Sequence, residues 1–195
     1  MTIRLIQEGL EDLCPMQGRT STYPHVSTII HQICLDRGYY VEEEDTEVAA
    51  QARLTRMQLG STLEWAVKDR YRHHYGNRFQ DIGETIHGGL ALTPDFVDTE
   101  TKLIHHPIAV DDVKFTYMSS NADPAGEKFE KYWMQVGAYC EALDTNIGRI
   151  RVCHPNGNYR DFRGPVFRVW EREFSRRERA ENWALIKSYQ RSMGL

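Results

Sequence analysis

IAVDDVKFTY, residues 108–117, has the composition of a buried strand that carries charged groups at its centre. Apolar, β-branched and aromatic side chains predominate in it, which favours a strand. Side chains alternate between the two faces of a strand, so Asp112 and Lys114 lie on one face and Asp111 points to the other. This segment therefore predicts a core strand that presents a carboxylate and an ammonium group together.

A second carboxylate, Asp95, precedes this strand in the segment Thr93-Pro94-Asp95. Residues 84–117 are rich in strand-forming residues separated by turn residues. Two carboxylates from neighbouring strands can hold a hard divalent cation such as Mg²⁺, which prefers oxygen ligands. A lysine beside that cation suits an attack of water on a phosphodiester, because charge builds up on the phosphate oxygens.

The remaining chain supplies helices on both sides of this β-rich region. Apolar positions spaced by three and four predict helices at about residues 29–35, 47–75, 124–143 and 174–193. Residues 149–168 alternate and contain the turn sequence PNGN, which predicts a hairpin. The last helix has Trp183, Ile186 and Tyr189 as its expected buried stripe. This order predicts an α/β fold in which a mixed β-sheet is flanked by helices and followed by a C-terminal amphipathic helix.

The bulk composition predicts one domain over residues 1–195. A chain of 195 residues with 41% hydrophobic content can bury one substantial core. It contains no apolar run of the roughly 20 residues needed to span a bilayer, so no membrane partner is expected. Its four cysteines are scattered without a C-x-x-C pair, which indicates the reduced thiols of a cytoplasmic protein and no zinc site.

Charge is unevenly distributed along the chain. Residues 1–148 carry 13 Lys and Arg against 23 Asp and Glu, a net charge of −10, whereas residues 149–195 carry 11 against 5, a net charge of +6. Such an asymmetry is typical of a face that binds a polyanion. Arg176, Arg177 and Arg179 are the candidate nucleic-acid contacts on the last helix; the alternative is that they form its solvated side.

Three further residues are candidates that are weak one by one. Glu64 lies between bulky apolar residues of the long helix and could extend the metal site, although an ordinary solvated glutamate is the alternative. Gln135 and Tyr139 are four residues apart on the next helix, so both side chains project from one face. Packing alone would also explain that pair.

The ordered set is more specific than its members. Glu64, then Asp95 after Pro94, then Asp112-X-Lys114, then Gln135-x-x-x-Tyr139 resembles the PD-(D/E)XK nuclease superfamily. Within it, the chain is most similar to the RecB and lambda-exonuclease branch, including phage-borne relatives of CRISPR-associated nucleases. The resemblance implies a restriction-endonuclease-like core at about residues 20–170, followed by the basic helix at about residues 171–195.

The resemblance also implies roles for the matched residues. Asp95, Asp112 and the backbone carbonyl of Val113 would bind Mg²⁺ or Mn²⁺, with Glu64 completing the site. Lys114 would orient the attacking water and stabilise its deprotonated form. Gln135 and Tyr139 would support Lys114 and the nucleic-acid backbone. No iron–sulphur cluster is expected, because the cysteines lack the cluster spacing seen in some members of the branch.

These expectations describe a metal-dependent deoxyribonuclease that leaves 5′-phosphate products in DNA recombination, repair or processing. Its expected partners are DNA and other recombination or phage proteins. Two alternatives stay open at this point. One is a DNA-binding or assembly protein on the same fold with weak or lost catalysis, and the other is an RNA endonuclease with the same metal chemistry.

Overall fold

The computed structural model describes residues 21–39, 46–100, 107–160 and 165–195. Within these residues, two α-helices precede five strands, and a third helix, two further strands and a fourth helix follow. The elements are α1 (Val26–Asp36), α2 (Glu47–Tyr75), the 3₁₀ turn η1 (Gly76–Arg78), β1 (Phe79–Gln80), β2 (Thr85–His87), β3 (Leu90–Leu92), β4 (Phe96–Asp98), β5 (Ala109–Phe115), α3 (Glu127–Ala142), β6 (Ile147–His154), β7 (Val166–Glu173) and α4 (Arg176–Ser192).

The main sheet is mixed and has the strand order β1-β4-β5-β6-β7. β5 and β6 pair in parallel, with Asp112 opposite Ile150, and α3 connects them. The other described pairs of this sheet are antiparallel, including the long β6–β7 hairpin. β2 and β3 form a separate two-stranded sheet. The prediction of a mixed sheet flanked by helices is confirmed.

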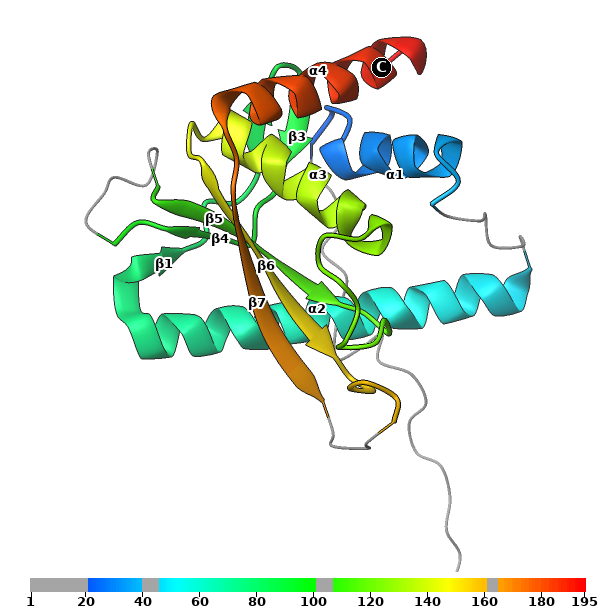
Figure 1. The fold of residues 1–195 in the computed structure, drawn as a ribbon, viewed down its shortest axis with the longest axis vertical. Helices are drawn as coiled ribbons and strands as arrows, with labels where there is room; N and C mark the ends of the chain where they lie inside the picture. The colour runs from blue at the N-terminus through cyan, green and yellow to red at the C-terminus, as the bar shows by residue number, and fades with distance from the viewer. Residues whose placement is uncertain (1–20, 40–45, 101–106, 161–164) are drawn as a thin grey trace, which may run out of the picture.

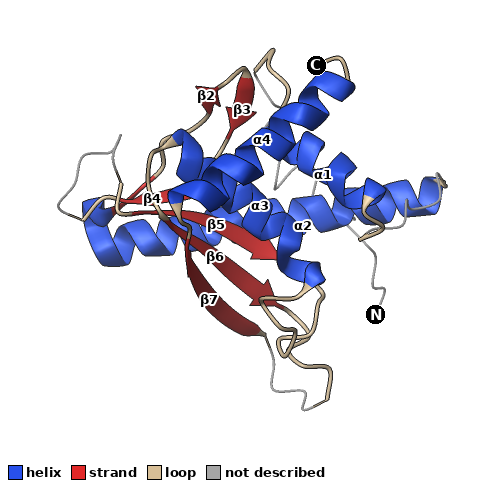
Figure 2. Cartoon of the chain, turned by 45° about the horizontal axis from the view of Figure 1, so that its top comes forward, coloured by secondary structure: helices blue, strands red, loops and turns tan. Residues whose placement is uncertain are grey.

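The helices cover the two faces of the sheet in different ways. Figure 1 shows the long helix α2 crossing one face, while α3 lies on the other. α1 and α4 pack against α3, so this side has a second helical layer, which Figure 2 shows from another angle. The expected stripe of α4 is confirmed: Ile186 is fully buried, and Trp183 and Tyr189 pack against the core.

Close approach of α3 to the sheet requires a glycine at the start of β6. A Cβ atom at Gly148 would overlap Val136 of α3 and touch Phe174. The larger core cluster occupies this side of the sheet, and a smaller one, Phe79, Phe96 and Val113, lies under α2. Apolar side chains therefore pack on both faces of the sheet, and β5 is its central strand.

Asp111 points to the α2 face, as the alternation of β5 predicts, and it is structural. Its carboxylate is fully buried and lies 2.6 Å from the guanidinium of Arg151 and 3.8 Å from that of Arg149. Burial raises the pKa of Asp111 to about 6, against the opposing effect of the two arginines. The opposite face of β5 carries Asp112 and Lys114, the residues of the candidate active site.

The helix expected at about residues 124–143 begins later, at Glu127. The reason is a turn ahead of it, in which Asp123 accepts hydrogen bonds from the N–H groups of Ala125 and Gly126. Pro124 lies inside that turn, and Gly126 takes the extended conformation at the helix N-cap. The predicted end, around residue 143, agrees with the structure.

Candidate active site

Asp112 and Lys114 project from the same face of β5 and form a buried ion pair. Lys114 Nζ lies 2.6 Å from Asp112 Oδ2, and the exposed fractions of the two side chains are 21% for Lys114 and 2% for Asp112. Burial opposes ionisation of both groups. It raises the pKa of Asp112 despite Lys114, whereas the nearby carboxylates outweigh burial and raise the pKa of Lys114. Lys114 is therefore a charged ammonium group at neutral pH.

Asp95 is held against β5 by two backbone hydrogen bonds. It lies in the short connection between β3 and β4. Its Oδ2 accepts the N–H of Val113 at 2.6 Å, and its own N–H donates to the carbonyl of Asp111 at 3.1 Å. The peptide groups on both sides of Asp112 thus position Asp95 beside it. The ligand role of the Val113 carbonyl stays a prediction.

Glu64 reaches the same place from α2. Its carboxyl group hydrogen bonds with that of Asp95, and Lys68, one helical turn later, lies 2.9 Å from Glu64 Oε1. The Lys68 ammonium also lies 3.2 Å from Asp95 Oδ1 and 3.7 Å from Asp81 Oδ2. Glu64 faces the site, while the next residue, Trp65, points outward and is 69% exposed. The Glu64 side chain is 38% exposed, so it borders solvent while it contacts Lys68.

The three carboxyl groups influence one another strongly. Burial, followed by the charges of Asp112 and Glu64, raises the pKa of Asp95 well above its ordinary value. Burial also acts to raise the pKa of Glu64, but the hydrogen bond from Asp95 and the Lys68 ammonium lower it below its ordinary value. Asp95 is therefore protonated more readily than Glu64. Such a site favours a cation.

Gln135 and Tyr139 connect α3 to the loop that carries Asp95. The Tyr139 hydroxyl accepts a hydrogen bond from the Gln135 side-chain amide at 2.5 Å and donates one to the carbonyl of Thr93 at 3.2 Å. Tyr139 is almost fully buried. The pair therefore fixes the backbone two residues before Asp95, and the structure brings Gln135 and Tyr139 to the same site as Asp95, Asp112 and Lys114.

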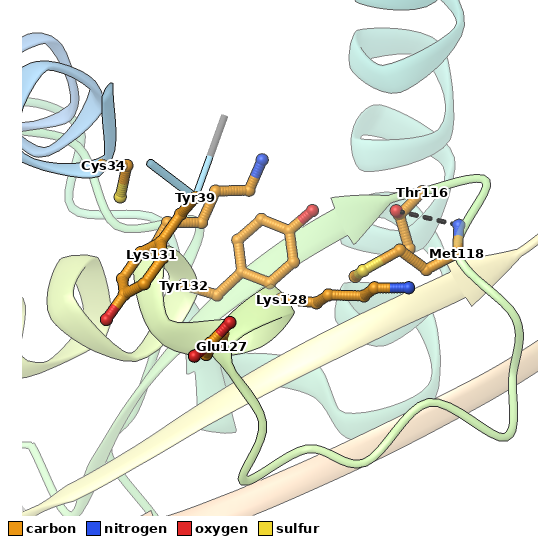
Figure 3. A pocket seen from close by; sticks show the side chains of 8 residues that line it. All are labelled: Cys34, Tyr39, Thr116, Met118, Glu127, Lys128, Lys131 and Tyr132. Atoms are coloured by element: carbon orange, nitrogen blue, oxygen red, sulfur yellow. Dashed lines mark hydrogen bonds between the residues drawn. The ribbon is translucent and has the colours of Figure 1, made fainter. Parts of the chain in front are cut away.

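A cavity of about 290 Å³ is lined in part by Tyr132, a neighbour of Lys114. Figure 3 shows its lining: Cys34 and Tyr39, Thr116 and Met118, and Glu127, Lys128, Lys131 and Tyr132 of α3. The centroid of the Tyr132 ring lies 5.8 Å from Lys114 Nζ and 4.8 Å from Lys131 Nζ, so this ring is near both lysines. Burial, followed by the charge of Lys114, lowers the pKa of Lys131 to about 8. The cavity is a basic extension of the site.

The donor set fits a hard divalent cation. Glu64, Asp95 and Asp112 offer carboxylate oxygens from three different elements, and Asp95 and Asp112 are buried close enough to repel each other. Across the described residues, no three His, Cys, Asp or Glu side chains are gathered closely enough to hold a metal ion as they stand. Lysine ammonium groups instead pair with these carboxylates.

The arginines expected to bind nucleic acid have different environments. Arg176 and Arg177 are exposed at the start of α4, and Arg177 pairs with Glu181 at 2.7 Å. Arg179 is buried instead, and the prediction for this residue is corrected. It donates hydrogen bonds to the carbonyls of Cys140 and Thr145, which anchors α4 to the end of α3 farthest from Lys128.

Five charged residues of the site and its cavity were not predicted from the sequence. Lys68 contacts Glu64 and Asp95, Asp81 contacts Lys68, and Glu127, Lys128 and Lys131 line the cavity. Lys131 precedes Gln135 by four residues and Lys128 precedes Lys131 by three, so helical spacing places them on the face of Gln135 and Tyr139. That spacing is the sequence signal that could have identified the two lysines. Lys68 has a similar spacing, because it follows Glu64 by four residues on the same helix.

Comparison with solved structures identifies similar folds. The crystal structure of the protein SSO0001 matches with a TM-score of 0.57 and 14% identity, over 92% of this chain and 80% of that one. LHK-Exo in complex with dAMP matches with a TM-score of 0.50 and 12% identity, over 88% of each chain. LHK-Exo is an alkaline exonuclease from Laribacter hongkongensis. The chain therefore has a fold similar to those of SSO0001 and LHK-Exo.

At the level of sequence, no protein-family model matches the chain, and no curated protein is significantly similar to it. Among the described helices, none combines the length and the apolar character that crossing a membrane requires.

Proposed function

We propose that the protein is a metal-dependent nuclease that hydrolyses phosphodiester bonds of DNA and belongs to the PD-(D/E)XK superfamily. One observation carries the proposal: Asp95 accepts the Val113 N–H next to the buried Asp112–Lys114 pair. The exonuclease fold of LHK-Exo supports the same conclusion. The expected setting is DNA recombination, repair or processing, including phage DNA metabolism.

Asp95, Asp112 and Glu64 are the residues that would hold Mg²⁺ or Mn²⁺. When bound, the cation supplies Lewis-acid activation of water and neutralises charge on the phosphate. Asp95 is suited to this task because its backbone hydrogen bonds fix it to the strand of Asp112. Tyr139 and Gln135 are positioning residues, since they hold the loop before Asp95 through the Thr93 carbonyl.

Lys114 is the catalytic residue of the proposed reaction. Its ammonium group lies beside Asp112 and is largely shielded from solvent, so its charge acts on a phosphate with little screening. It would orient the attacking water and stabilise the negative charge that grows on the phosphate oxygens. The in-line attack breaks the bond to the 3′ oxygen, which leaves with a proton, and the phosphate stays on the 5′ end.

Lys128 and Lys131 would hold a neighbouring phosphate of the same strand. Both line the cavity next to Lys114, and DNA backbone contacts are made largely by lysine and arginine. Figure 3 shows the two side chains on either side of Tyr132, so a strand passing the ring would meet both. Arg176 and Arg177 remain proposed contacts of a longer substrate.

Purified protein should be incubated with end-labelled linear DNA, circular DNA and RNA in Mg²⁺, Mn²⁺ or EDTA. The proposal expects DNA cleavage with either metal, 5′-phosphate ends, and no cleavage in EDTA. Asp95→Asn and Asp112→Asn should abolish cleavage and weaken Mn²⁺ binding in calorimetry. Glu171→Gln, which makes the same kind of change to an exposed carboxylate of β7 that pairs with Arg149, is the matched control.

Each alternative gives a different result in this experiment. Cleavage of RNA alone assigns an RNA endonuclease. DNA binding without cleavage of any substrate, in either metal, assigns a binding or assembly protein on a nuclease fold. Unchanged Mn²⁺ affinity in both asparagine variants would move the metal site elsewhere.

A further inference from the structure

Lys68 places its ammonium group where three carboxylates meet. Its Nζ lies 2.9 Å from Glu64, 3.2 Å from Asp95 and 3.7 Å from Asp81. The side chain is only 15% exposed. The three partners come from α2, from the segment after β1 and from the connection between β3 and β4. The positive charge of Lys68 therefore offsets the repulsion among acidic groups that lie close together, and Arg72 also contacts Asp81.

The two oxygens of Asp95 face different partners, and Glu64 also hydrogen bonds with this carboxyl group. Oδ2 accepts the N–H of Val113 at 2.6 Å, and Oδ1 faces Lys68 at 3.2 Å. Releasing Val113 would require the backbone of the central strand to move. Lys68 can leave more easily, because its ammonium group is at the end of a flexible four-carbon chain. A cation that takes Oδ1 of Asp95 therefore displaces Lys68 and leaves the strand in place.

We propose that Lys68 is a resident counter-cation, which competes with the divalent metal for Asp95 Oδ1 and Glu64 and so sets the metal affinity of the site. This inference rests on the proposed function, because it concerns the same metal. Lys68 stabilises the metal-free acidic cluster and weakens metal binding. Lys114 has a different position, since its partner is Asp112 and its Nζ lies 5.8 Å from the ring centroid of Tyr132.

The sign of the effect distinguishes competition from structural support. If Lys68 merely supports the site, its removal disorders Glu64 and Asp95 and weakens metal binding. If Lys68 competes, its removal leaves both oxygens to the metal and strengthens binding. Methionine is a suitable replacement, because it is unbranched, flexible and uncharged.

The test is calorimetric titration of Mn²⁺ into four full-length proteins: wild type, Lys68→Met, Lys68→Arg and Arg72→Met. We expect Lys68→Met to bind Mn²⁺ about tenfold more tightly than wild type, the effect of losing one charged competitor. Lys68→Arg keeps the charge and should stay close to wild type. Arg72→Met is the matched control, since Arg72 is on the same helix and contacts Asp81 at 3.3 Å, outside the Glu64–Asp95 pair.

In case Lys68→Met is too unstable for titration, its thermal unfolding should also be measured in EDTA and in Mn²⁺. A variant that is destabilised in EDTA and recovers in Mn²⁺ supports the proposal, because the metal then replaces the lost charge. A variant that stays unfolded in Mn²⁺ overturns it.

The remaining outcomes separate this inference from the proposed function. Equal or weaker Mn²⁺ binding by a folded Lys68→Met, with wild type binding, overturns the competition and leaves the nuclease proposal intact. Binding by Lys68→Met alone supports the competition. Absence of Mn²⁺ binding in all four proteins overturns both the metal site and the inference.

Discussion

Lys114 has Asp112 on one side and the ring of Tyr132 on the other. In the proposed reaction its charge matters most when negative charge grows on the phosphate, so its contribution is larger in the transition state than in the ground state. Lys114→Ala should therefore reduce the single-turnover cleavage rate by a factor on the order of 10² or more. DNA affinity, measured in Ca²⁺, should change far less, because one phosphate contact among several is lost.

Thermal unfolding of Lys114→Ala must accompany that measurement, because the change leaves the buried Asp112 without its ion pair. A folded variant that cuts as fast as wild type would show that the reacting phosphate lies elsewhere.

Lys131 gives the DNA affinity a dependence on pH. Its pKa in the folded protein is about 8, below the ordinary value, because of burial and the charge of Lys114. A bound phosphate favours the charged form, so affinity should be highest below pH 8 and fall as the pH rises through that value. Binding of a short DNA in Ca²⁺, followed from pH 7 to about pH 9.5, tests this. Lys131→Arg keeps its charge over that range and should lose the decline.

An equal decline of affinity in wild type and Lys131→Arg would assign the pH dependence of binding to another group.

The lowered pKa of Lys131 also predicts how its effect on stability depends on pH. Above pH 8 the folded state loses the Lys131 proton before the unfolded state does, so the unfolding free energy of wild type rises with pH relative to Lys131→Met.

Among the helices and strands, the bounds that follow from short-range sequence signals were predicted best. The structure begins α2 at Glu47 and ends it at Tyr75, as expected from its periodic apolar positions. Local chemistry fixes both ends: Thr46 accepts the Ala49 N–H at the start, and Gly76 has a positive φ of 58° at the end. By contrast, α3 begins three residues after the expected Pro124, because Asp123 stabilises a turn that competes with the helix.

Contacts between elements were the part that the sequence could not reveal. Arg179 belongs to a basic run that favours a solvated or DNA-binding face. It is nevertheless buried, because its guanidinium donates hydrogen bonds to carbonyls at the end of α3. Lys68 forms with Glu64 a pair of the kind common on helix surfaces, and only the approach of Asp95 from the sheet gives it a different role. Asp112 and Lys114 were predictable together because side-chain alternation places them on one face of a strand. Asp95 lies just before β4, and backbone hydrogen bonds to Val113 and Asp111 complete its placement.

Gly60 permits a test of the surface of α2. It lies inside the helix, and no atom is within 4 Å of the position that a Cβ would take, so an alanine has room there. Gly60→Ala should increase the unfolding free energy by about 0.5–1 kcal/mol, because glycine loses more backbone freedom on folding. Denaturant unfolding measures this, and the cleavage rate should stay at the wild-type value. Lower DNA affinity in a stabilised Gly60→Ala variant would instead indicate that the substrate approaches α2 closely.

At the scale of the whole molecule, two basic regions lie toward opposite ends of α3. Lys128 and Lys131 belong to its first turns, whereas Arg176 and Arg177 start α4, which Arg179 anchors beyond the last turn of α3. Their contributions to DNA binding can be measured separately as salt dependence. Each lost phosphate contact lowers the slope of log affinity against log salt by about 0.9 for duplex and about 0.7 for single-stranded DNA.

Lys128→Ala/Lys131→Ala should lower this slope by about two such contacts even for a short oligonucleotide. Arg176→Ala/Arg177→Ala should lower it only with DNA long enough to reach α4. An unchanged slope in the arginine pair at every length would leave these residues as the solvated side of the helix.

The fluorescence of Trp65 can be used to follow the binding of DNA. Its indole is 69% exposed and directly follows Glu64, whereas Trp133 is 7% exposed and Trp170 and Trp183 are partly buried against the core. A soluble quencher such as iodide will therefore reach the Trp65 indole most readily, and the quenchable part of the intrinsic fluorescence reports largely on one residue of α2. DNA that covers this part of α2 would shield the indole, so arrival of substrate can be timed without a label and apart from bond cleavage.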